Sequence, residues 1–206
     1  MVATGTLCSD NNPCTSNESC QSNGTCGGSS NTPKDTSCGT GLYCDGSGTC
    51  KCKTKSTANL LMNPGFDGSV SSWASKGYSS TDVESCSGSG SALVNPVTGA
   101  PNIDQCVTTG ITTNTAYGFG VQFKSDSGGG NGYCVVTFYD QVGCSGNSSN
   151  PDNYMANPQS SGGWAAAILG FNTNSDTKSI DVFCSAANGS GYYDRLYLTP
   201  ADKAGY

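Results

Sequence analysis

Eight of the thirteen cysteines lie within the first 52 residues, and hardly any large apolar side chain lies among them. Before residue 57 the large apolar residues are Met1, Val2, Leu7, Leu42 and Tyr43. So few side chains cannot bury a core that offsets the entropy cost of ordering such a segment. Because disulfides are the usual substitute for a core, the segment is expected to be a small, irregular, disulfide-rich domain.

An internal repeat organises these cysteines. The stretch PCTSNESCQSNGTC (13–26) aligns with SCGTGLYCDGSGTC (37–50), and both keep a Cys-x5-Cys-x5-Cys frame that closes on Gly-x-Cys. A fourth cysteine lies outside each frame, before the first copy and after the second. Pairing first to third and second to fourth predicts the bonds Cys8–Cys20, Cys14–Cys26, Cys38–Cys50 and Cys44–Cys52, although spacing alone leaves other connectivities open.

Two other uses of the cysteines fit the spacing less well. Zinc sites favour ligands two to four residues apart, often with histidine. Here the gaps within the repeated frame are five residues, the only close pair is Cys50–Lys51–Cys52, and histidine is absent. Redox catalysis requires a Cys-x-x-Cys pair or an activated thiol, and the sequence has neither pattern. The frame therefore favours structural disulfides.

The blocks NPCT…C…GTC and TSCGTGLYCDGSGTC resemble the short cysteine-rich repeats of large secreted bacterial proteins. The resemblance covers residues 7–52. It implies a spacer or stalk, and it implies no particular activity.

The stretch KCKTKSTAN (51–59) is polar and basic, and the composition changes just after it. We expect a domain boundary there, with residues 1–56 forming the disulfide-rich domain and residues 57–206 a second domain.

In the second domain, apolar residues alternate with polar ones at 116–123, 134–140, 179–184 and 195–198, and Gly/Asn/Ser-rich turns lie between them. This pattern predicts an all-β, antiparallel sandwich or jelly roll.

Three stretches add a resemblance to carbohydrate-binding modules of the galactose-binding-like jelly-roll type. They are NLLMNPGFDG…W (59–73), IDQCVTTGITTNTAYGFGVQFK (103–124) and YYDRLYL (192–198). The resemblance implies the fold, which hosts sugar binders, adhesion domains and spacers alike.

Sugar binding would need an outward aromatic side chain. Trp73 and Trp164 occupy core positions of the pattern, since tryptophan is mostly buried. Tyr78, Tyr133, Tyr154, Tyr192 and Tyr193 remain. Because Tyr192 and Tyr193 are adjacent in a strand, they point to opposite faces, so at most one belongs to the core. The ligand-binding candidates are Tyr78, Tyr192 and Tyr193.

The same resemblance implies a structural calcium ion near the domain ends, held by an acidic residue of the last strand and by groups of the first loop. The matching residues are Asp67 in PGFDG and Asp194 in YYDR. Carboxylate oxygens suit calcium. Two ordinary surface aspartates are the alternative, and no other cofactor is expected.

The remaining five cysteines are assigned by strand parity. Val83 and Ile103 are expected to point inward, which places Cys86 and Cys106 outward and pairs them. Cys134 lies on the same strand face as Val136 and Phe138, and Cys184 on the same face as Ile180 and Val182. Both cysteines are therefore expected to point inward and to pair through the core. Cys144 lies in the turn QVGCSGN and has no assigned partner. It is expected to be a free thiol, to replace Cys134 or Cys184 in their bond, or to form a disulfide with another chain.

Composition excludes several function classes. The net charge is −6 with a single arginine, so no basic patch suits nucleic acid. No apolar run is long enough for a membrane helix, and MVATGTLC has no leader pattern, so a mature secreted form is expected. The cysteine content favours an oxidising, extracellular or cell-surface location. Enzymatic activity is not expected, since histidine is absent and only two glutamates occur.

Two functions fit these observations. The first is a non-catalytic extracellular binding or adhesion module that recognises a glycan or a surface polymer. The second is a structural subunit of an extracellular fibre or surface layer that assembles with copies of itself, with the cysteine-rich part as a stapled spacer or connector.

Overall fold

The computed structural model describes residues 3–39, 42–52, 56–74, 77–86, 88–149 and 155–203. The chain forms two compact units, one comprising residues 1–54 with 84–87, and the other residues 55–83 with 88–206. The predicted boundary at residues 56 and 57 stays a prediction. Among the described residues, no helix is both long and apolar enough to cross a membrane.

The cysteine-rich unit consists of short strands and turns. Its strands are β1 (Thr15–Ser16), β2 (Ser19–Cys20), β3 (Cys26–Gly27), β4 (Ser30–Asn31), β5 (Ser37–Gly39), β6 (Leu42–Cys44) and β7 (Cys50–Cys52). They pair as β1–β4, β2–β3 and β5–β6–β7, all antiparallel. Between residues 3 and 52, the described hydrophobic side chains that are buried are Cys14 and Cys44. This unit therefore has no apolar core of its own among the residues described.

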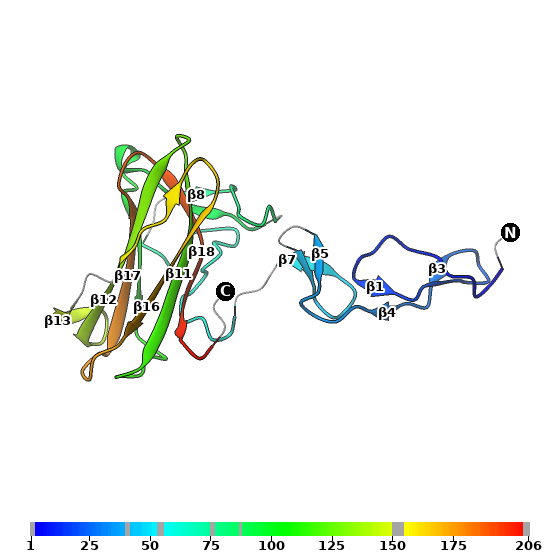
Figure 1. Cartoon of the computed structure of the whole chain (residues 1–206), viewed down its shortest axis with the longest axis horizontal. Helices are drawn as coiled ribbons and strands as arrows, with labels where there is room; N and C mark the ends of the chain where they lie inside the picture. Colours follow the sequence, from blue (N-terminus) through cyan, green and yellow to red (C-terminus); the bar gives the residue numbers. More distant parts are fainter. Residues whose placement is uncertain are drawn as a thin grey trace. The chain divides into compact units, whose positions relative to one another are not determined.

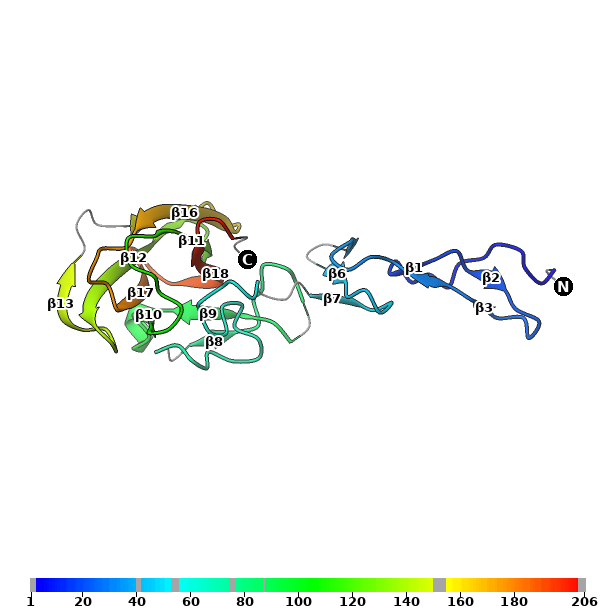
Figure 2. The same ribbon diagram turned by 90° about the horizontal axis from the view of Figure 1, so that it is seen from below.

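The second unit is an antiparallel β-sandwich, as predicted (Figures 1 and 2). One sheet has the order β16-β11-β18-β9-β8, and the other has the order β10-β17-β12-β13 with β14 and β15 also paired to β12. The strands are β8 (Tyr78–Ser79), β9 (Ser91–Val94), β10 (Asn102–Val107), β11 (Ala116–Ser125), β12 (Gly130–Gln141), β13 (Ser145–Ser149), β14 (Met155–Ala156), β15 (Gln159–Ser160), β16 (Ala165–Asn172), β17 (Ser179–Ala186) and β18 (Gly191–Pro200). A short 3-10 helix, η1 (Pro96–Thr98), follows β9.

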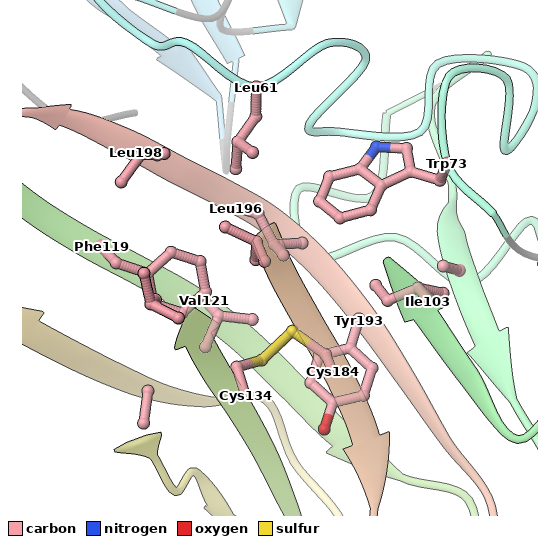
Figure 3. Close-up of a cluster of buried hydrophobic side chains, with 14 of the residues drawn as sticks. Leu61, Trp73, Ile103, Phe119, Val121, Cys134, Cys184, Tyr193, Leu196 and Leu198 are labelled. Carbon is pink, nitrogen blue, oxygen red and sulfur yellow. A yellow bond between two sulfur atoms is a disulfide. The ribbon is translucent and has the colours of Figure 1, made fainter. Parts of the chain in front are cut away.

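The core lies between the two sheets and follows the predicted alternation. Tyr117, Phe119, Val121 and Phe123 of β11 are buried, as are alternate residues of β12 and β17. Figure 3 shows Leu196 and Leu198 of β18 in the same cluster as the Cys134–Cys184 bond. Strand periodicity thus leaves some side chains of these strands outside the core, among them Asp181 and Phe183 of β17.

Six disulfides cross-link the chain, and two join pairs that were expected. Cys38 bonds to Cys50, and Cys134 bonds to Cys184, its direct partner across β12 and β17. The other four bonds are Cys8–Cys26, Cys14–Cys44, Cys52–Cys86 and Cys106–Cys144.

The first-to-third and second-to-fourth rule is wrong elsewhere in the cysteine-rich unit, because one bond joins the two repeats. Cys14 lies in a loop that reaches the second repeat and bonds to Cys44 there. With Cys14 and Cys44 paired together, Cys8 takes Cys26, and Cys20, predicted to be bonded, keeps a free thiol.

The pairing of Cys86 with Cys106 is also wrong. Residues 81–86 do not form a strand, so parity does not apply to Cys86, which bonds to Cys52. Cys106 does point outward, and it takes Cys144. The turn of Cys144 is held beside β17 by a hydrogen bond from the Cys144 N–H to Ser179 Oγ (2.9 Å). Cys144 is therefore neither free nor available for another chain.

Candidate binding face of the sandwich

The outward side chains of β10, β17 and β12 form one continuous face. Register places Asp104, Phe183 and Val135 in one row across the three strands. The next row contains Asp181 and Thr137. All five side chains are half-buried. We call this surface the Phe183 face.

Two carboxylates on the Phe183 face are partly shielded from water. The pKa of Asp181 is raised to about 6, mainly by burial and to a smaller extent by the negative charge of Asp104. Burial also raises the pKa of Asp104, partly offset by the hydrogen bond that Asn102 Nδ2 donates to its Oδ1 (2.9 Å). A half-buried carboxylate lacks some of the water that would solvate it, so it is a strong acceptor for a ligand hydroxyl group.

Aromatic and amide groups continue the face along β12. The rings of Tyr133 and Phe183 lie with centroids 6.2 Å apart and tilted by 40°. At the Tyr133 end, a cavity of about 390 Å³ is lined by Tyr133, Asn131, Asn157 and Gln159, among others. Aromatic rings beside a few fixed polar groups are the usual composition of a small-ligand site.

The opposite sheet carries a smaller aromatic patch. The ring of Tyr197 lies against Gly118 and Gly120 of β11, occupying space that a side chain at position 120 would need. A hollow of about 210 Å³ beside it is lined by Gln122, Arg195 and Tyr197, among others. This patch has one aromatic ring and no carboxylate among its lining residues, so it offers fewer groups for a sugar than the Phe183 face.

The predicted tyrosines are placed differently from one another. Tyr193 is fully buried and donates its hydroxyl to the carbonyl of Ser185, so its assignment as a ligand-binding residue is corrected to core. Tyr192, on the outer side, is half-buried and donates to Asp126 Oδ1 (2.7 Å). Tyr78 is 40% exposed at the sheet edge. Tyr154 lies outside the described residues.

The two tryptophans also differ. Trp73 is 6% exposed, packs on Phe66 and donates from its ring nitrogen to the carbonyl of Asn63, which places it in the core as predicted. Trp164 is half-buried rather than buried, and it lies one residue before β16.

Acidic residues of the sandwich also gather beside the first half of the last strand, β18. Asp194 is fully buried, and both it and Asp82 belong to a group of acidic side chains whose carboxylate oxygens lie within 4.8 Å of one another. Asp194 accepts hydrogen bonds from the N–H groups of Val83 (3.0 Å) and Arg195 (2.7 Å). Buried like charges need compensation, and an all-oxygen donor set fits calcium.

Asp67, the other predicted calcium ligand, is exposed. Among the residues described, it belongs to no such group of three or more metal-binding side chains. The other group, the sulfurs of Cys14, Cys38 and Cys44, is fully oxidised to disulfides and offers no thiolate for zinc.

Asp104, Asp181, Phe183 and Tyr197 were not predicted as site residues. The stretch SIDVFC carries a usable signal, because inward Ile180, Val182 and Cys184 force Asp181 and Phe183 outward. Phe183 was not predicted, because only tyrosine and tryptophan were treated as residues that could stack on a sugar. The proximity of Asp104 to Asp181 depends on the register of β10 on β17, which periodicity does not contain.

Comparisons with known proteins support the fold. No family model matches the sequence, and no curated protein matches it. Among solved structures, the C-terminal family 22 carbohydrate-binding module of Clostridium thermocellum Xyn10B is similar, with a TM-score of 0.53 and 16% identity over 72% of this chain and 99% of that chain. The CBM22-1 xylan-binding domain of Paenibacillus barcinonensis Xyn10C has a TM-score of 0.50 and 13% identity over 74% of this chain and 100% of that chain.

A third similar structure is the enzymatically active domain of tailspike protein 4 from bacteriophage CBA120. Its TM-score is 0.56, with 15% identity over 69% of this chain. This chain spans about a fifth of that domain, since the match covers 21% of it. At these identities the likeness concerns the fold.

Proposed function

We propose that the chain is an extracellular, non-catalytic protein whose sandwich binds a glycan on the Phe183 face. The observation that carries the proposal is the combination on one sheet face of a tilted aromatic pair, Tyr133 and Phe183, with two half-buried carboxylates, Asp104 and Asp181. The aromatic patch on the opposite sheet, beside Tyr197, has no carboxylate among its lining residues.

The chemistry of the face matches the chemistry of a sugar. A pyranose ring presents C–H groups on its faces, which pack against the apolar face of an aromatic ring such as Phe183. Its equatorial hydroxyl groups are donors, for which Asp104 and Asp181 are acceptors. The amides of Asn131, Asn157 and Gln159 supply both donors and acceptors at the cavity. An extended polysaccharide would place successive sugar units along the Phe183 face, from the carboxylates to the cavity beside Tyr133.

Xylan is the first polysaccharide to test. Modules whose structures are described as xylan-binding share the fold of the sandwich, which supports a glycan partner without identifying the sugar. The disulfide content supports an extracellular setting, where such polymers occur.

The decisive experiment is affinity electrophoresis in gels that contain xylan, followed by calorimetry with xylo-oligosaccharides. Phe183→Ala is expected to weaken binding about tenfold or more, because it removes the stacking surface. Tyr197→Ala is the matched control, since it removes an outward aromatic from the opposite sheet and should leave the affinity unchanged.

Three outcomes would contradict parts of the proposal. Equal binding by wild type and Phe183→Ala, with loss in Tyr197→Ala, would move the site to the other sheet. Binding to none of a broad set of polysaccharides would contradict glycan recognition. Release of reducing ends from a bound polysaccharide would contradict the non-catalytic assignment.

We further propose that a structural calcium ion neutralises the carboxylates of Asp82 and Asp194. The close approach of the two carboxylates, one of them fully buried, supports this assignment. Chelation should lower the melting temperature of the sandwich, and added calcium should restore it. An unchanged melting temperature after removal of all calcium would contradict a calcium site, and Asp67→Asn, which alters an exposed side chain, should melt as wild type does.

A further inference from the structure

The two cysteine-rich repeats have the same hairpin. In the first repeat Cys20 lies directly opposite Cys26, and in the second Cys44 lies directly opposite Cys50. Each hairpin is closed by the same backbone bond across its loop, from Gln21 N–H to Thr25 O and from Asp45 N–H to Thr49 O. The disulfides that tie each hairpin to the segment before it are equivalent, namely Cys8–Cys26 and Cys38–Cys50.

The segment before each hairpin is hydrogen-bonded to it in the same way. The Cys20 N–H donates to Thr6 O and the Cys44 N–H donates to Thr36 O, both at 2.8 Å. The carbonyls of Cys20 and Cys44 accept from the residues just before those threonines, Gly5 and Asp35, at 2.9 and 2.8 Å. Cys20 in the first repeat is therefore the structural equivalent of Cys44 in the second.

In the second repeat this position binds another segment of chain. Cys44 is bonded to Cys14, and the side-chain amide of Asn12 donates to the carbonyl of Gly48 at 2.8 Å. Asn31 and Thr15 cover Gly48, since a Cβ added there would lie 2.9 Å from Asn31 Oδ1 and 3.4 Å from the Thr15 methyl group. The surface formed by Cys44 and Gly48 is thus occupied by a Pro-Cys loop.

In the first repeat the same surface is open. Gly24 is the equivalent of Gly48, and the two share a left-handed conformation, with φ of 83° and 88°. A Cβ added at Gly24 would meet nothing within 4 Å. Cys20 is the one cysteine without a disulfide, and all thirteen lie in the described part of the chain. The first repeat therefore carries both elements of the docking surface, a free thiol and an uncovered glycine turn.

We propose that the surface of Cys20 and Gly24 is a covalent docking site for the Asn-Pro-Cys loop of a cysteine-rich repeat in another polypeptide. The loop would place its asparagine amide on the Gly24 carbonyl and its cysteine on Cys20, as Asn12 and Cys14 do at Gly48 and Cys44. The bond forms by exchange. The Cys20 thiolate attacks the incoming sulfur in a mixed disulfide with glutathione, the new S–S bond forms, and glutathione leaves as the thiol.

The test uses the intact, oxidised chain and a synthetic peptide of its own residues 9–16, SDNNPCTS, supplied as the mixed disulfide with glutathione. The control peptide has leucine in place of the asparagine at position 12, with the same cysteine. In a glutathione buffer, mass mapping should show the native peptide on Cys20, favoured over the control about fivefold, as expected for one hydrogen bond. The Cys20→Ser variant should take neither peptide.

Several results would overturn the proposal. Equal labelling by both peptides would show an accessible thiol without loop recognition. No labelling by the native peptide, while iodoacetamide alkylates Cys20, would show that the surface rejects the loop. Equal labelling of Cys20→Ser would place the reaction at another cysteine, and a dimer through Cys20 that forms in preference to the peptide adduct would replace the loop by a second copy.

Discussion

Asp181 shows how a single residue of the Phe183 face affects the whole sandwich. Its pKa is raised from 3.8 to about 6, first by burial and then by the charge of Asp104. Because the folded chain holds this proton to higher pH than the unfolded chain does, folding binds protons between these two values. The group therefore lowers stability as pH rises through that range, which is the cost of keeping a partly desolvated acceptor on the surface.

At the residue scale we predict that Asp181→Asn flattens this pH dependence. The free energy of unfolding of wild type should fall between pH 4 and pH 6 through the Asp181 contribution, which is absent below the unfolded pKa and complete above the folded one. Urea unfolding at several pH values would measure both proteins. Asp126→Asn is the control, because the hydrogen bond from Tyr192 lowers the pKa of Asp126. Parallel profiles for wild type and Asp181→Asn would contradict the prediction.

At the element scale, β11 packs differently on its two faces. Inward it presents large side chains to the core, and outward it presents Gly118 and Gly120, against which Tyr197 of β18 lies. A glycine in a strand usually weakens it, and one common reason for its presence is the close approach of a neighbouring group. Here that group is the ring of Tyr197.

The two glycines provide a matched pair of variants. Gly120→Ala is expected to destabilise the sandwich by about 1–3 kcal/mol, because its methyl group would overlap the Tyr197 ring. Gly118→Ala should be neutral or slightly stabilising, since its Cβ would lie at an ordinary contact distance of 3.8 Å from that ring. Thermal unfolding of both variants tests this. Equal effects of the two substitutions would show that Tyr197 does not lie where it is described.

At the scale of the whole molecule, the two units are stabilised by different means. The sandwich has a core of large side chains, such as Phe119, Phe138 and Leu196, around the Cys134–Cys184 bond. The cysteine-rich unit has no comparable core among its described residues, and four disulfides connect its segments. Disulfides stabilise mainly by restricting the unfolded chain, so their reduction should affect the two units unequally.

Reduction is therefore predicted to unfold the cysteine-rich unit first. After treatment with a reductant, trypsin should cleave at Lys34 and Lys51, while the sandwich stays resistant. The Cys134→Ala/Cys184→Ala variant shows what the core bond contributes, and its loss should lower stability by about 2–5 kcal/mol without abolishing the fold. Retention of protease resistance throughout residues 3–52 after complete reduction would contradict this account.

The sequence by itself determined the class of each part. Dense cysteines without apolar residues require covalent stabilisation, and period-two alternation requires strands with one buried face, because both follow from local composition and backbone geometry. The inward positions of β11, β12 and β17 are therefore where alternation predicts them.

Only the tertiary structure decided which side chains meet. The bond between Cys14 and Cys44, the proximity of Asp104 to Asp181 and the burial of Tyr193 all depend on contacts between segments far apart in the chain. The spacing of the cysteines is compatible with several disulfide pairings. The alternation of apolar residues separates the two faces of a strand, but it does not determine which neighbouring strand pairs with it or in which register. The free thiol is Cys20 rather than Cys144 because the loop of Cys14 docks on the second repeat and the turn of Cys144 is held beside β17.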